Sequence, residues 1–157
     1  MKEIELKINE RALFERIIAE SGIAAQIKED TGQPSHLSTR AIITEDDKSL
    51  IDDYIATAIS ECVIAINHNL APCMVVYDYD PSDIRYKTHR LCINVPDNYP
   101  EEAVTSLEDI IKNIAINRCL QQWYMLVKCD DLSSCSLKTQ LYMQLLHEAL
   151  TLRKKPL

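Results

Sequence analysis

The sequence predicts an α+β protein, mainly α: a helical bundle of about four helices with a protruding β-hairpin and a short N-terminal strand. Three observations predict this fold class. Apolar residues recur at helical spacing over four long segments, alternate with polar residues over residues 2–8, and alternate again in two runs within residues 73–95. A chain of 157 residues is also long enough for one domain-sized core.

Residues 1–43 are expected to form a strand, a helix and a loop that precede the rest of the fold. The alternation over residues 2–8 indicates a half-buried strand, which we expect to pair with the edge of another chain. Helical spacing follows from residue 10 to about residue 27, and Gly22 weakens or kinks that helix. Residues 28–43 show no period and predict a loop.

Residues 44–152 are expected to contain three more helices and the hairpin. The Thr44 hydroxyl can accept an amide at the start of the first of these helices, where three acidic residues favour the positive end of the helix dipole. Pro100 begins a second helix that runs to about Val127. The last helix is predicted from about Ser134 to Leu152. Its apolar residues are spaced by three and four: Leu137, Leu141, Leu145, Ala149 and Leu152.

The charge is acidic and uneven along the chain. There are 17 Lys and Arg residues against 24 Asp and Glu residues, so the formal net charge is −7. Three of the basic residues lie in a C-terminal tail, residues 153–157, which leaves −10 on residues 1–152. This balance disfavours a protein that binds nucleic acid over a broad basic face.

Several classes of protein are excluded by composition. The only glycines are Gly22 and Gly32, and a phosphate-binding loop needs clustered glycines, so no nucleotide cofactor is expected. No apolar run is long enough to span a membrane, and the N-terminus lacks the apolar stretch of a secretory signal. We therefore expect a cytoplasmic protein with no membrane contact, whose six cysteines are reduced thiols.

No metal site is expected. The nearest approach to one is the set of His68, Cys73, His89 and Cys92 around the hairpin, which lacks the close Cys and His spacing of zinc sites. Buried thiols and surface imidazoles explain these residues more simply.

No catalytic residue is expected either. Cys119, Cys129, Cys135 and His147 are the candidates for nucleophilic chemistry, but helix cores and helix ends explain their positions. The sequence therefore favours a protein that is not an enzyme. A thiol enzyme remains a third class, and it would require an exposed cysteine with a low pKa.

Three segments resemble the head–tail connector (adaptor) proteins of tailed bacteriophages. They are the acidic start and amphipathic helix of residues 44–55, the proline-led helix start of residues 95–103, and the Gln-Gln-Trp-Tyr sequence of residues 121–124. The resemblance covers residues 44–152, whereas residues 1–43 depart from shorter family members.

The resemblance implies a structural virion protein without enzymatic activity. In that family, about a dozen copies form a ring beneath the portal and extend the channel for DNA. The implied partners are other copies of the chain, the portal protein and tail components, and the ring is assembled in the bacterial host cytoplasm. DNA passes through such a channel without sequence-specific binding, for which an acidic surface is suited. The basic tail is the candidate contact with the portal or a neighbour: Arg153, Lys154, Lys155 and Leu157.

The hairpin supplies the candidate surface between subunits. An isolated hairpin is marginally stable in water, so the many apolar residues on this one suggest that another surface covers it. The candidate residues are Tyr77, Tyr79, Ile84 and Tyr86. The alternative function is a small cytoplasmic helical module, protein-binding or regulatory, whose acidic face meets a basic partner.

Overall fold

The computed structural model describes residues 2–30, 42–69, 74–127 and 131–152. Over these ranges the chain is mainly α with a three-stranded antiparallel sheet, which confirms the predicted fold class. The elements in chain order are β1 (Lys2–Asn9), α1 (Glu10–Asp30), the 3₁₀ turn η1 (Glu45–Asp47), α3 (Lys48–Asn69), β2 (Met74–Asp80), β3 (Asp83–Val95), α4 (Glu101–Val127) and α5 (Leu132–Leu152).

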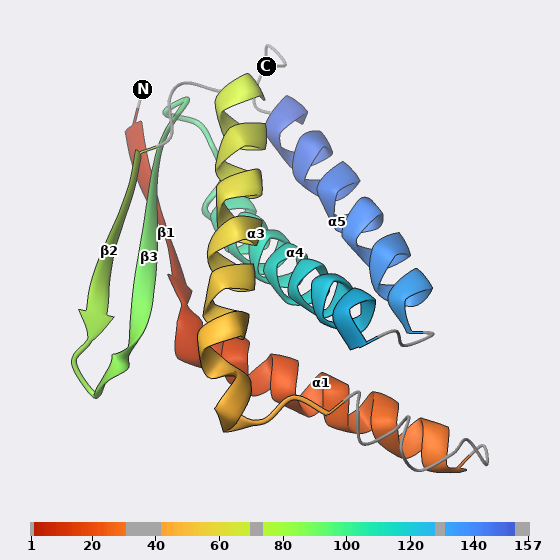
Figure 1. Ribbon diagram of the computed structural model, residues 1–157. Coiled ribbons are helices and arrows are strands. Elements are labelled where there is room, and N and C mark those ends of the chain that lie inside the picture. The colour runs from red at the N-terminus through yellow and green to blue at the C-terminus, as the bar shows by residue number, and fades with distance from the viewer. Residues whose placement is uncertain (1, 31–41, 70–73, 128–130, 153–157) are drawn as a thin grey trace.

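The sheet and the helices occupy opposite sides of the molecule. Figure 1 shows the sheet along one side, α3 beside it, and α5 on the far side. The helix α4 packs against α3 and α5, and α1 extends across one end. The strand order is β1-β3-β2, so β3 is central and β2 forms the edge that faces away from the helices. No helix in the described ranges is both long enough and apolar enough to cross a membrane.

The partner of the N-terminal strand differs from our expectation. β1 pairs with β3 of its own chain, from Lys2 opposite Val95 to Asn9 opposite Thr88, so the predicted pairing with another chain's edge is wrong. The reason is that the 13-residue β3 has two edges: the seven-residue β2 pairs with one, and the other is open to β1. The other edge of β1 meets α4, where the Lys7 amide donates to Glu108 Oε1 at 3.1 Å.

The first helix is longer than predicted. It continues through Gly22, where an added Cβ would meet no other part of the protein within 4 Å, and ends at Asp30 inside the segment expected to be a loop. The Asn9 side chain caps its start, because Asn9 Oδ1 accepts the Ala12 amide at 3.1 Å. Further along, the buried Ile43 amide donates to Ser21 Oγ at 3.1 Å and ties the next segment to α1.

The predicted cap at Thr44 is present as a capping box on the 3₁₀ turn before α3, in which the Thr44 side chain accepts the Asp47 amide. The Thr44 hydroxyl also lies 3.3 Å from Asp47 Oδ2, to which it donates. The same carboxylate oxygen accepts the Thr44 backbone amide at 2.9 Å. Asp47 therefore closes the 3₁₀ turn that precedes the helix.

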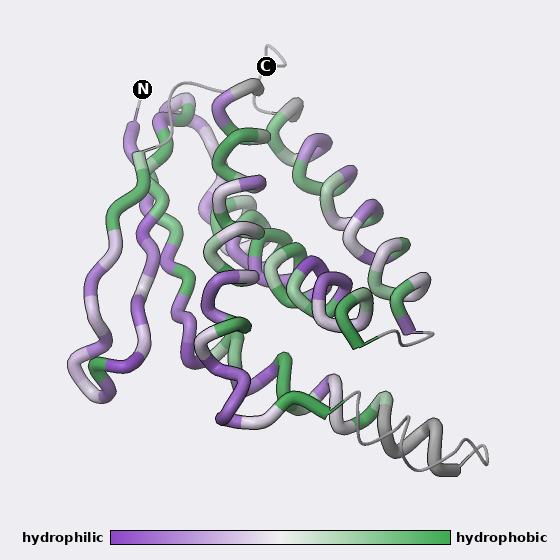
Figure 2. The backbone as a smooth tube through the Cα atoms, viewed as in Figure 1, coloured by the Kyte–Doolittle hydropathy of each residue, from purple (hydrophilic) through white to green (hydrophobic). Residues whose placement is uncertain are grey.

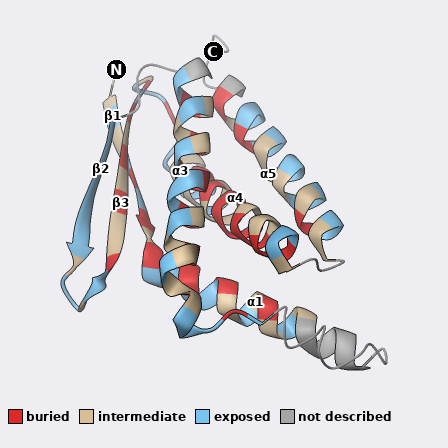
Figure 3. Ribbon diagram, in the orientation of Figure 1, coloured by how far each residue is buried: buried red, intermediate tan, exposed pale blue. Residues whose placement is uncertain are grey.

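One hydrophobic core joins both parts of the chain. Leu6 and Phe14, from the N-terminal part, lie in the same buried cluster as Ile55 and Ile111. Figure 2 shows hydrophobic residues along α4, and Figure 3 shows that much of α4 is buried. A boundary at residue 43 therefore does not separate two cores.

The last helix does not bury its most regularly spaced leucines against the rest of the protein. It begins at Leu132, two residues before the predicted start, and buries Cys135, Leu146 and Leu150. The three evenly spaced leucines lie on the opposite, solvent side of α5. We call this set the α5 leucine stripe: Leu137, Leu141 and Leu145.

Candidate interaction surface

The outer strand of the hairpin exposes an unusual amount of apolar surface. All residues of β2 from Met74 to Tyr79 are exposed, and the start of β3 adds Ile84, which is 76% exposed. Tyr77 and Tyr79 are 55% and 59% exposed. We call this set the hairpin patch: Met74, Val75, Val76, Tyr77, Tyr79 and Ile84. Three of the four predicted surface residues therefore lie in one exposed patch.

The two exposed tyrosines are held in place by their neighbours. Their rings meet edge to face with centroids 6.4 Å apart. The Lys87 Nζ lies 4.6 Å from the Tyr77 ring centroid and 5.9 Å from that of Tyr79. Tyr77 also lies opposite His89 in the sheet, with ring centroids 6.3 Å apart. Val75, Tyr77 and Tyr79 thus form an ordered part of the patch on the side of the sheet that carries Leu91, whereas Met74 and Val76 lie on its other face.

The backbone of β2 offers free hydrogen-bonding groups to solvent. The Lys87 amide donates to Glu10 Oε1 at 3.1 Å, which places it on the side of β3 away from β2. Tyr79 lies opposite Lys87, and alternate residues of an antiparallel strand direct both backbone groups to opposite edges. Val75, Tyr77 and Tyr79 therefore direct their amides and carbonyls away from β3, along the open edge.

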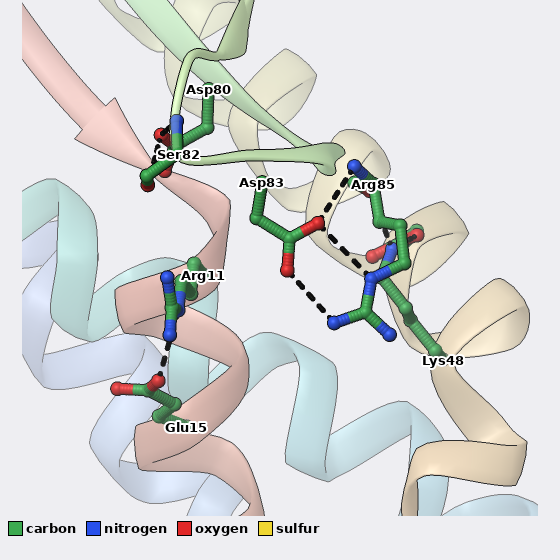
Figure 4. Close-up of polar contacts among 8 residues, drawn as sticks. Arg11, Glu15, Lys48, Asp80, Ser82, Asp83 and Arg85 are labelled. Atoms are coloured by element: carbon green, nitrogen blue, oxygen red, sulfur yellow. Dashed lines mark hydrogen bonds and ion pairs between the residues drawn. The ribbon is translucent and has the colours of Figure 1, made fainter.

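The turn of the hairpin is fixed by carboxylate hydrogen bonds (Figure 4). Asp80 Oδ1 accepts the Ser82 hydroxyl at 2.6 Å and the Ser82 amide at 2.9 Å. Asp83 accepts the Arg85 guanidinium at 2.8 and 3.0 Å. The bonds from Ser82 lower the pKa of Asp80, and those from Arg85 hold the pKa of Asp83 at about 2. Both carboxylates are therefore charged at neutral pH, and they fix the turn next to Ile84.

The fourth predicted surface residue is not on the surface. Tyr86 is only 3% exposed and packs against Phe14, with ring centroids 6.1 Å apart, so its assignment to the exposed patch is wrong. The cause is a register irregularity: Tyr79 pairs with Lys87, yet Asp80 pairs with Asp83. The extra residues on β3 break the two-residue alternation and turn Tyr86 into the core.

Polar contacts to two helices anchor the turn end of the hairpin. Glu10, the first residue of α1, is buried and accepts the Lys87 amide, and its Oε2 lies 2.8 Å from His89 Nε2. From α3, Lys48 donates to the Arg85 carbonyl at 2.9 Å and pairs with Asp52. Sequence reasoning missed these anchors, because their partners lie 37 to 79 positions apart and no local pattern links them.

The residues considered for a metal site do not converge. His89 contacts Glu10, whereas Cys92 lies three positions further along β3 and therefore on the other face of the sheet. Cys73 and the side chain of His68 lie outside the described residues. Over the ranges that the structure describes, no three His, Cys, Asp or Glu side chains gather closely enough to hold a metal ion.

The described thiols differ from an activated nucleophile. Cys62, Cys119 and Cys135 are buried. Burial raises the pKa of Cys62 to about 12 and also raises the pKa of Cys119, whereas a reactive cysteine has a lowered pKa. Cys129 lies outside the described residues, and His147 lies on the exposed side of α5.

A groove of about 350 Å³ lies between α1, α4 and α5. Its lining combines apolar residues with charged ones of both signs, including Glu20, Asp131 and Lys138. Cys135, at the start of α5, also lines the groove. Its open shape and mixed lining differ from the enclosed apolar pockets that hold small molecules.

The predicted basic contact residues lie outside the described residues. They are Arg153, Lys154, Lys155 and Leu157. The hairpin patch is therefore the predicted interaction surface that the structure lets us describe.

Comparisons with known proteins do not identify a relative. No protein-family model matches the chain, and no curated protein or solved structure matches it.

Proposed function

We propose that this chain is a structural protein, a subunit of the head–tail connector of a tailed bacteriophage. In this proposal, copies of the chain form a ring beneath the portal and extend the channel for the genome. The observation that carries the proposal is the hairpin patch: an ordered, exposed apolar surface on an edge strand. We infer that the assembly is a head–tail connector from the resemblance of residues 44–152 to connector proteins.

The placement of exposed apolar residues supports a ring. The hairpin patch lies on one side of the molecule, and α5 with its leucine stripe lies on the other (Figure 1). A contact between two different surfaces joins copies head to tail, and such contacts close into a ring when the rotation between neighbours allows it. Two different exposed apolar surfaces on opposite sides of the molecule support head-to-tail contacts of this kind.

The charge of the chain fits a channel for DNA. Residues 1–152 carry a net charge of −10, and carboxylates near DNA phosphates prevent tight binding. The basic tail, Arg153–Leu157, is our candidate for the contact with an acidic surface of the portal or a neighbouring subunit. The portal protein and tail components are the proposed partners in the virion.

Reconstitution with a portal tests this function. The full chain is mixed with purified portal rings encoded next to its own gene, and the mixture is sedimented and imaged by cryo-electron microscopy. We expect a ring of this chain beneath the portal, with Tyr77 and Ile84 buried between neighbours. A chain that stays in the supernatant and forms no ring on the portal contradicts the proposal and favours the acidic binding module.

A further inference from the structure

The two edges of the sheet are not equivalent. The outer edge of β1 is covered by α4, where Glu108 accepts the Lys7 amide. The outer edge of β2 carries the outward backbone groups of Val75, Tyr77 and Tyr79. The Lys7 amide on the outer edge of β1 is therefore already paired, so that edge is less available to β2 of another copy than the edge of β2 is. An exposed β2 edge is instead a template for an extended strand that is itself free.

Two copies of β2 can pair with each other as antiparallel strands. In an antiparallel pair of two β2 strands with Tyr77 opposite Tyr77, Val75 lies opposite Tyr79, and all three outward residues meet outward residues. This register uses all seven residues of β2. On the helix-facing side it forms aromatic and β-branched cross-strand pairs, which are favourable.

The charges of the strand also fit this register. Asp78 of one copy lies opposite Val76 of the second copy, so no two carboxylates are directly opposed. Within its own chain Asp78 pairs with Arg90, and Arg90 lies beside Val76 in the sheet. The register therefore places each Asp78 between its own Arg90 and the Arg90 of the second copy, which is two strands or roughly 10 Å away and within reach of an arginine side chain.

We propose that the unassembled chain forms a two-fold dimer through antiparallel pairing of its β2 strands, centred on Tyr77. The paired strands join two three-stranded sheets into one of six strands. This dimer goes beyond the proposed ring, and it uses the same strand. A chain paired in this way hides its hairpin patch, so ring assembly requires the dimer to separate. The dimer thus protects an aggregation-prone edge until the chain meets its partners.

A cysteine substitution on the two-fold axis tests the register. In Tyr77→Cys, the two substituted positions come within about 5.5 Å between Cα atoms, a separation that suits a disulfide. Under mild oxidation we expect a link between two copies of position 77, identified by peptide mass spectrometry. The matched variant Val75→Cys places its two positions roughly 14 Å apart and should give at least about tenfold less of the equivalent link.

Light scattering on the full chain tests the dimer itself. We expect the wild type to show twice the chain mass of 18.0 kDa at high concentration. Tyr77→Pro removes an outward amide and leaves the bonds to β3, so this variant should keep its circular dichroism spectrum and become monomeric. Ile84→Ser, in the same hairpin but outside β2, should stay dimeric.

Two outcomes overturn the dimer. One is a wild type that is monomeric at all concentrations. The other is association of the unassembled chain, with no portal present, without a link between positions 77. A chain that shows neither dimer nor link before portal is added, yet forms rings on the portal, would support the proposed function while removing this inference, so the two failures are distinguishable.

Discussion

Tyr79 and Tyr86 lie seven positions apart on one hairpin, yet Tyr79 is exposed and Tyr86 belongs to the core. Strand alternation predicts the exposed pair Tyr77 and Tyr79, because residues two apart share a face. It cannot predict Tyr86, since extra residues on β3 interrupt the period between Tyr79 and that position. The sequence carries no local signal of that irregularity.

The two tyrosines should respond very differently to truncation. Tyr86→Ala leaves a cavity against Phe14 and removes the ring that Lys48 Nζ approaches to 4.5 Å, so we expect it to lower the free energy of unfolding by about 3 kcal/mol. Tyr79→Ala, at an exposed position, should lower it by less than about 1 kcal/mol. Urea denaturation of both variants measures the difference. Equal losses would contradict the placement of Tyr86 in the core.

Asp52 makes the stability of the fold depend on pH, and the direction of that dependence follows from its pKa. Burial raises the pKa of Asp52, and this effect outweighs the lowering by Lys48. A carboxyl whose folded pKa is raised destabilises the fold when it is charged and ceases to do so as it is protonated. Relative to Asp52→Asn, the native chain should therefore gain stability as the pH falls from 7 toward the usual value of 3.8. Denaturation curves at several pH values test this, and a constant or reversed difference would refute it.

At the level of elements, periodicity predicted the type of each segment better than its partner. The hairpin, the N-terminal strand and the long helices were predictable, because each has an apolar face with a recognisable spacing. The partner of β1 and the buried face of α5 were not. α5 carries apolar residues on two opposite sides, and spacing alone does not say which side contacts α4.

The joint between the hairpin and α1 depends on one carboxylate. Glu10→Ala leaves the Lys87 amide and His89 without their acceptor in a buried place, so we expect a loss of about 2 kcal/mol in the free energy of unfolding. Glu10→Gln keeps one acceptor oxygen and should lose about half as much. Thermal or urea unfolding measures both. A neutral Glu10→Ala variant would mean that the pair does not anchor the hairpin.

For the whole molecule, the candidate surface was predictable only in part. Composition and charge predicted an acidic chain that lacks the glycines of nucleotide-binding loops, and the apolar hairpin predicted a surface that another molecule covers. The open edge of β2 emerges only from the strand order, with α4 covering the opposite edge. The claim that copies of the chain associate through this edge rests on that arrangement.

Amide exchange within β2 tests this claim most directly. Val75, Tyr77 and Tyr79 direct their amides outward, whereas Val76 and Asp78 direct theirs to β3 and serve as internal controls. Nuclear magnetic resonance on the full chain compares their exchange rates in dilute and concentrated solution. We expect the outward amides to exchange quickly when dilute and to be protected at least about tenfold when concentrated. Outward amides that exchange at one fast rate at every concentration would contradict the account.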